Sequence, residues 1–79
     1  MSYGYSARLV QLNKQASMQN WGVKLGRLCI REDIPVCMVA SKLGVSRQTV
    51  YNWFCGANTP QDASLVSIKA LMRVIKILK

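Results

Sequence analysis

Apolar residues recur along this chain at the spacing of an α-helix, and no segment alternates between apolar and polar residues as a β-strand would. In the segment from 20 to 32, for example, the apolar side chains are separated by four, three and one positions, so they share one side of a helix. The helical segments are 7–12, 20–32, two short segments within 36–55, and 62–79. This pattern predicts an all-α fold, a compact bundle of about five short helices.

The segment 36–55 predicts two short helices that meet at a tight turn. Val39 and Leu43 share one face of the first helix, and Val50 and Trp53 form the apolar stripe of the second. Because each helix has only this narrow apolar side, we expect the two helices to pack against each other and against the rest of the bundle. The other side of the second helix is then left facing outward.

The turn between these helices contains residue types that favour it. Gly44 can adopt the positive φ that ends one helix, and Ser46 can cap the next by accepting from the backbone N–H of Gln48 or Thr49. Gly56 is expected to end the second helix. A bracing helix, a tight turn and an outward-facing helix form the arrangement by which helix-turn-helix proteins present a helix to the major groove of DNA.

These residues resemble the helix-turn-helix of lambda-repressor-like (Cro/C1-type, XRE) DNA-binding domains. The match comprises the run from Ala40 to Ser46, followed by Val50 and by the Trp-x-x-Gly-x-x-x-Pro pattern that begins at Trp53. In all, the resemblance covers residues 23 to about 72. The family often has Gln at the start of the first of the two helices, where it contacts a phosphate, whereas this chain has Val36 there.

The outward face of the second helix is the candidate base-reading surface, and it has no acidic residue. Arg47 can donate two hydrogen bonds to guanine, and Gln48 or Asn52 can pair bidentately with adenine. Thr49 can contact a thymine methyl group or a phosphate. The resemblance also implies base readers at these outward positions. An ordinary solvated helix face would more often carry Glu and Lys.

Candidate contacts to the DNA backbone surround this face. They are Lys42, Ser46, Tyr51, Asn58 and Thr59. Ser46 lies at a helix N-terminus, where free N–H groups and the helix dipole favour a phosphate. Tyr51 can stack on a sugar or bond a phosphate. For Asn58 and Thr59 the resemblance supplies the expectation, because relatives commonly contact the backbone from the loop after the reading helix.

Composition favours a binding protein over an enzyme. Seventy-nine residues suffice for one domain, and eleven Lys and Arg against three acids give a net charge of +8, which suggests a polyanionic partner. With no His and few acids, we expect no catalysis, no metal site and no cofactor. The three cysteines, Cys29, Cys37 and Cys55, are interpreted as small apolar core residues in a reducing compartment.

No run approaches the roughly twenty apolar residues of a membrane span, and the N-terminus lacks an apolar signal core. We therefore expect a cytoplasmic, nucleoid-associated protein of a bacterial or phage-infected cell, with no membrane partner. Residues 19–79 are expected to form the DNA-binding domain. Residues 1–18 have two interpretations: a basic arm that places Arg8 and Lys14 on DNA, or an extra helix that packs on the domain through its leucines.

The C-terminal segment from about 62 to 78 has more apolar surface than one core-facing side needs. Its apolar residues sweep roughly 220° of the helix, whereas a core-facing stripe needs little more than about 100°. Four of them step by three, four and three positions, as on the seam of paired helices: Ile68, Leu71, Ile75 and Leu78. We expect a homodimer through this helix. The alternative is a packed last helix whose far side is covered by the N-terminal segment.

These expectations converge on a small sequence-specific regulator that binds double-stranded DNA. The resemblance implies a Cro-like transcriptional repressor, encoded by a phage or mobile element, on a palindromic operator with half-sites about one helical turn apart. The alternative is an interaction adaptor, in which the helix-turn-helix serves as a scaffold and the apolar last helix binds polymerase or another partner. Val36, in place of the phosphate-contacting Gln, favours the adaptor.

Overall fold

The computed structural model describes residues 5 to 78, apart from the side chain of Leu78. Over that range the chain forms five α-helices and no strand. The helices are α1 (Ala7–Gln15), α2 (Trp21–Arg31), α3 (Val36–Leu43), α4 (Arg47–Phe54) and α5 (Asp62–Leu78). The predicted all-α bundle with a helix-turn-helix within 36–55 is confirmed.

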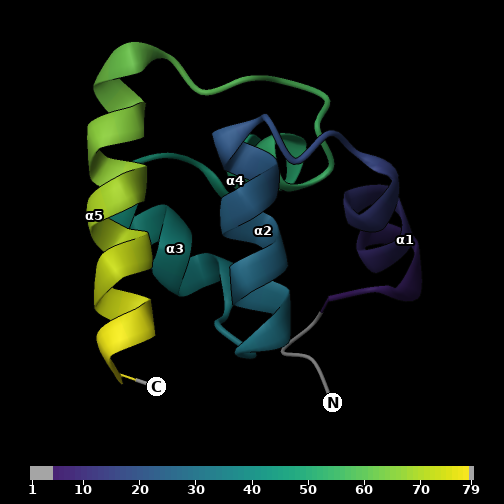
Figure 1. Cartoon of the computed structure of the whole chain (residues 1–79), viewed down its shortest axis with the longest axis horizontal. Helices are drawn as coiled ribbons and strands as arrows, with labels where there is room; N and C mark the ends of the chain where they lie inside the picture. Colours follow the sequence, from purple (N-terminus) through teal and green to yellow (C-terminus); the bar gives the residue numbers. More distant parts are fainter. Residues whose placement is uncertain (1–4, 79) are drawn as a thin grey trace.

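Helix α2 lies at the centre of the bundle, because it contacts α1, α4 and α5 (Figure 1). In Figure 1, α5 runs alongside α2 on one side, α1 lies on the other side, and α3 and α4 lie behind α2. The side chains that meet between these helices are almost wholly apolar. The largest of them that are fully buried are Phe54, Leu25, Ile68, Val23, Val39 and Val50.

Helix α1 is fixed to the bundle by Asn13, whose side chain is only 1% exposed. Its Nδ2 donates to the backbone oxygen of Phe54 at 2.7 Å and to that of Val23 at 3.2 Å. Its Oδ1 accepts from Nε of Arg27 at 3.4 Å, and the guanidinium of Arg27 also donates to the backbone oxygen of Asn13 at 3.0 Å. A polar side chain is stable in such a core only when its hydrogen bonds are made, so these contacts account for its burial.

Gly26 allows α1, α2 and α4 to approach one another closely. A Cβ at Gly26 would lie 2.7 Å from Cγ of Phe54 and 2.8 Å from Nδ2 of Asn13, which is closer than real Cβ contacts. Glycine within a helix lowers its stability by about 1 kcal/mol relative to alanine. The position is therefore occupied by glycine because the packing of three helices requires it.

Two titratable groups lie in the core, Tyr5 near the start of the chain and Cys29 in α2. The Tyr5 hydroxyl donates to the backbone oxygen of Ile34 at 2.6 Å, and burial raises the pKa of Tyr5 well above its usual range. Burial also raises the pKa of the Cys29 thiol to about 12. Cys55 is partly buried, but Cys37 is exposed on the solvent side of α3, so the expectation that all three cysteines lie in the core is wrong for Cys37.

Helix α5 closes the core with the residues that were expected on a pairing seam. Ile68 is 0% exposed and Ile75 is 2% exposed, and Leu71 packs against the same core. A side chain buried within one copy is not available to a second copy, so the seam prediction is wrong for Ile68 and Ile75. The side chain of Leu78, the fourth residue of that seam, lies outside the described residues.

The opposite side of α5 is apolar and exposed. Val66 is 72%, Val74 50% and Ile77 76% exposed. Helix α1 contacts α2 and α4 but not α5, so the N-terminal segment, as far as it is described, does not cover this side. The wide apolar sweep of α5 thus divides into a core face and a separate exposed stripe, which we define as Val66, Val74 and Ile77.

Candidate nucleic-acid interface

The helix-turn-helix formed by α3 and α4 is built as the sequence predicts. Gly44 ends α3 with a φ of 69°, in the left-handed region that favours glycine. The Ser46 hydroxyl accepts from the N–H of Thr49 at 3.1 Å and so caps the start of α4. Val50 and Trp53 are buried, at 0% and 6% exposure, which turns the other side of α4 outward.

The outward side of α4 brings two of the predicted base readers, Gln48 and Asn52, into contact. Arg47 and Gln48 are exposed and Asn52 is partly exposed. Nε2 of Gln48 donates to Oδ1 of Asn52 at 3.0 Å, so the two amides form a bonded pair. The pair still has free N–H groups on both amides and a free oxygen on Gln48. Adenine offers one acceptor and one donor in the major groove, and this set of groups matches both.

Thr49 lies at the edge of this face and has a different role from its neighbours. Its Oγ1 is 2.9 Å from the Oγ of Ser46, within the cap of α4. Its side chain also lines a hollow of about 400 Å³ with Asn58 and Thr59. Thr49 therefore faces the loop after α4, whereas Gln48 and Asn52 face the other flank of the helix.

The predicted backbone contacts come from α3, α4 and the segments that flank α4. Four of them are exposed: Lys42, Ser46, Asn58 and Thr59. Tyr51 is partly buried and packs against the core. The loop after α4 is held to the start of α2, because Nδ2 of Asn20 lies 3.4 Å from the Asn58 backbone oxygen and 3.4 Å from Oγ1 of Thr59.

Helix α1 lies beside α4 on the flank of Gln48 and Asn52, opposite the loop that follows α4. Sequence reasoning did not predict this position. A hollow of about 430 Å³ lies between α1 and α4, lined by Arg8 and Leu12 from α1 and by Gln48, Tyr51 and Asn52 from α4. Arg8 is exposed, so it adds a positive charge beside the amide pair. The spacing of leucines in α1 predicts a helix, but no signal within the segment says which neighbour that helix meets.

Val36 occupies the place where the lambda-repressor-like family often has Gln. Its side chain is 5% exposed and belongs to the core. Pro35, which precedes α3, makes no side-chain capping bond. The start of α3 thus contributes to packing, and the side chain at position 36 is not positioned to contact a phosphate.

The charge on this surface is not compensated by acids. Within residues 5 to 78 the one ion pair joins Arg31 and Glu32 at 3.2 Å, and the segment 46–59 contains no acid. No group of three or more His, Cys, Asp or Glu that could hold a metal occurs in the described part of the chain. In the same range, no helix is both long and apolar enough to cross a membrane.

Comparisons with protein-family models, with curated proteins and with solved structures found no match. The resemblance to the lambda-repressor-like domains thus depends on the motif residues of the chain itself. In the structure Gly44 lies at the turn, Ser46 caps α4, and Val50 and Trp53 lie in the core.

Proposed function

We propose that this chain is a sequence-specific regulator that binds double-stranded DNA, with the action of a Cro-like transcriptional repressor. The observation that carries the proposal is α4 itself, a capped helix after a tight turn with the exposed Arg47 at its first residue and the bonded amides of Gln48 and Asn52 on its outward side. Guanidinium and amide groups are the side chains that read guanine and adenine bidentately, and this face has no acid to repel DNA.

In the proposed complex, α4 enters the major groove by its N-terminal end. Arg47 contacts guanine, the amide pair of Gln48 and Asn52 contacts adenine, and Thr49 contacts a thymine methyl group or a phosphate. The phosphate contacts come from Lys42, Ser46, Tyr51, Asn58 and Thr59, to which we add Arg8 from α1. Binding at an operator then represses transcription by blocking polymerase. The chain contributes binding and no catalysis.

A second copy of the chain completes the proposed operator complex. A single short helix reads few base pairs, and regulators of this kind gain affinity by binding two half-sites with a symmetric dimer. The exposed stripe of α5 supports a pairing surface there, because within residues 5 to 78 no segment covers its apolar side chains. Sedimentation at micromolar concentration tests this, with Val66→Gln/Val74→Gln expected to shift a dimer to a monomer. A monomeric parent protein would contradict the dimer.

Selection from a random library of double-stranded DNA tests the regulator. We expect an enriched palindrome, bound with an affinity that falls steeply as salt rises. Arg47→Ala should reduce binding to that site by about 1–3 kcal/mol and relax the preference at one base pair. Lys14→Ala is the matched control, since it removes an exposed positive charge from α1 outside the proposed contact set.

Two results would count against this function. Salt-sensitive binding without an enriched sequence would indicate a nonspecific coating protein. Selection could also enrich a sequence that the Arg47→Ala and Gln48→Ala/Asn52→Ala variants bind with the same preference as the parent protein. That result would mean that another surface reads the DNA. The cellular setting that we propose is the cytoplasm of a bacterial or phage-infected cell, where a phage or mobile-element repressor meets its operator.

A further inference from the structure

A second positively charged surface lies between α2 and α5. Its main hollow, of about 410 Å³, has an apolar lining from Trp21, Met72 and Ile77 and a rim of Lys69, Arg73 and Lys76. A neighbouring hollow of about 250 Å³ shares Met72 and Lys76 and extends the same surface along α2. We call the two together the α2–α5 groove.

The α2–α5 groove is separate from the helix-turn-helix. Neither hollow is lined by any residue between 36 and 59. In Figure 1, α3 and α4 lie behind α2. A ligand in the groove therefore meets none of the residues proposed to contact DNA from α3, α4 and the loop that follows.

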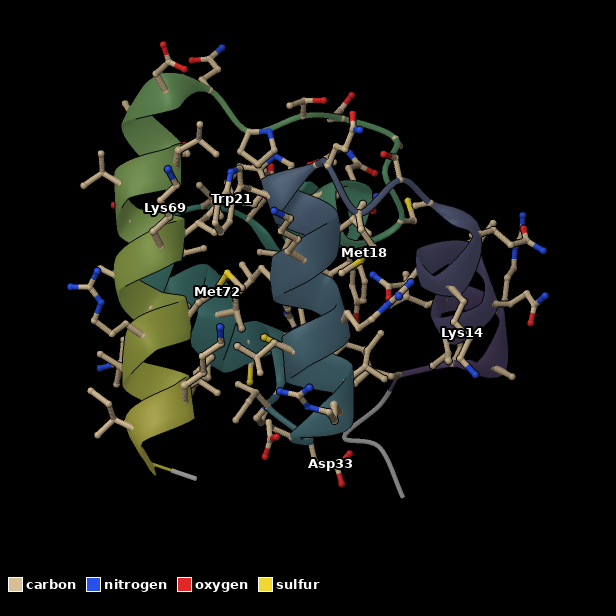
Figure 2. All side chains as sticks on the ribbon, in the orientation of Figure 1. Lys14, Met18, Trp21, Asp33, Lys69 and Met72 are labelled. Atoms are coloured by element: carbon tan, nitrogen blue, oxygen red, sulfur yellow. The ribbon has the colours of Figure 1, made fainter. Side chains whose placement is uncertain are left out.

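Two lysines from different helices converge on one aromatic ring in this groove. Nζ of Lys24 lies 4.2 Å from the ring centroid of Trp21, and Nζ of Lys69 lies 4.7 Å from it. Figure 2 shows Trp21, Lys69 and Met72 together in the space between α2 and α5. The attraction of each ammonium group to the ring helps to hold both charges at the groove.

The positive charges of the groove repel one another. Lys69 and Arg73 are four positions apart, and Arg73 and Lys76 are three, which are the spacings at which like charges weaken a helix. Lys24 has the same relation to Arg27 on α2. Within residues 5 to 78 only Arg31, at one end of the groove, has an acidic partner. An anionic ligand would relieve this repulsion.

We propose that the α2–α5 groove binds an acidic amphipathic helix of a partner protein. Two helices that lie side by side leave a channel in which a third helix can rest its apolar stripe, here on Trp21 and Ile77, beside Met72, which is only 8% exposed. Carboxylates that flank that stripe would meet Lys69 and Arg73 on the rim. Charge complementarity thus specifies an acidic partner, and the apolar lining specifies an amphipathic one.

Nucleic acid matches the groove less well. A phosphate backbone would use the charges but not the apolar lining. Stacking of a base on Trp21 would have to displace the ammonium groups that already lie over its ring. An acidic helix uses both the lysines and the apolar residues as they stand. This inference does not depend on DNA binding by α4.

Fluorescence anisotropy with a designed peptide tests the proposal on the full chain. The probe is an 18-residue helix with a leucine stripe flanked by glutamates, and the reference is a peptide of the same composition without a continuous stripe. We expect the stripe peptide to bind at least about tenfold more tightly than the reference, and its binding to weaken as salt rises. The fluorescence of tryptophan should change on binding in the parent protein and not in Trp21→Phe.

Matched variants locate the binding site. Lys69→Gln should lower the affinity for the stripe peptide by about fivefold or more. Lys14→Gln, on α1 at the other side of α2 (Figure 2), should leave that affinity unchanged. Ile77→Ser should also weaken it, because that side chain is 76% exposed and lines the groove. Far-UV circular dichroism confirms that each variant keeps its helices.

Three outcomes would overturn the proposal. The two peptides could bind equally, which would indicate general charge attraction. Lys69→Gln and Ile77→Ser could both bind the stripe peptide with the affinity of the parent protein, which would mean that the peptide binds outside the α2–α5 groove. A random-sequence DNA duplex could displace the peptide from Arg47→Ala protein, which would make the groove a nucleic-acid site. Loss of operator binding in Arg47→Ala with peptide binding retained would separate this surface from the proposed DNA function.

Discussion

The hydrogen bonds of Asn13 give a quantitative prediction about how α1 is held to the bundle. Leucine has the same branched arrangement of side-chain heavy atoms as asparagine, with larger methyl groups, and it neither donates nor accepts, so Asn13→Leu removes the bonds without leaving a cavity. The backbone oxygen of Phe54 accepts from Nδ2 of Asn13 at 2.7 Å and lies at the end of α4, where no further turn of helix supplies a donor. In the variant this buried oxygen has no partner.

The free energy of unfolding should fall by about 2–4 kcal/mol. An unsatisfied buried carbonyl costs about 1–3 kcal/mol, and loss of the second bond, to Val23, contributes about 1 kcal/mol. Domains of this size unfold with only about 5–15 kcal/mol, so the loss is a large part of the total. The estimate depends on the 1% exposure of Asn13, because an exposed amide would exchange these bonds for water.

Denaturant unfolding followed by far-UV circular dichroism measures this change. Gln11→Leu is the control, because it makes the same kind of substitution on the exposed side of the same helix and should alter stability by no more than about 0.5 kcal/mol. If Asn13→Leu unfolded at the same denaturant concentration as Gln11→Leu, the amide would not be what holds α1. A lower midpoint with an unchanged slope would support the reasoning.

Three further predictions concern DNA contacts, packing and pH. Lys42→Ala should weaken binding to all DNA sequences about equally and lower the salt dependence by about one unit of log–log slope, measured by titration at several salt concentrations. Gly26→Ala should lower the denaturation midpoint, because the added Cβ would lie 2.7 Å from Phe54, and this outweighs the helix preference of alanine of about 1 kcal/mol. A raised midpoint would show that the core rearranges to accept the methyl group. Stability should fall as pH rises above about 9, because the folded state keeps the Cys29 proton up to a pKa of about 12 and Tyr5 keeps its proton similarly, while the unfolded chain releases both earlier; unchanged unfolding between neutral and alkaline pH would contradict this.

The sequence predicts the helix-turn-helix well because its signals are local. Gly44 is needed at the turn whatever surrounds it, and Ser46 bonds a backbone group only three residues away. The candidate readers follow from this, since Val50 and Trp53 fix which side of α4 is inside. Periodicity within one helix therefore suffices to predict which side of α4 is exposed.

The other features depend on contacts between distant segments, which local patterns do not encode. Both sides of α5 are apolar, so periodicity does not decide between Ile68 and Val66 as the core residue, and the seam prediction included Ile68 and Ile75, which face inward. Asn13 has partners 10 and 41 positions away, and its polar side chain alone suggests exposure. The α2–α5 groove likewise needs the pairing of two helices that lie far apart in the chain.

The bond between Asn13 and Phe54 has a consequence for recognition. It joins the last turn of α4 to α1, while the Ser46 cap fixes the first turn, so both ends of the eight-residue helix are restrained before any ligand is present. An isolated helix of that length would be mostly unfolded in water. The entropy lost on ordering α4 is therefore lost when the domain folds. The free energy of ligand binding does not have to offset that loss.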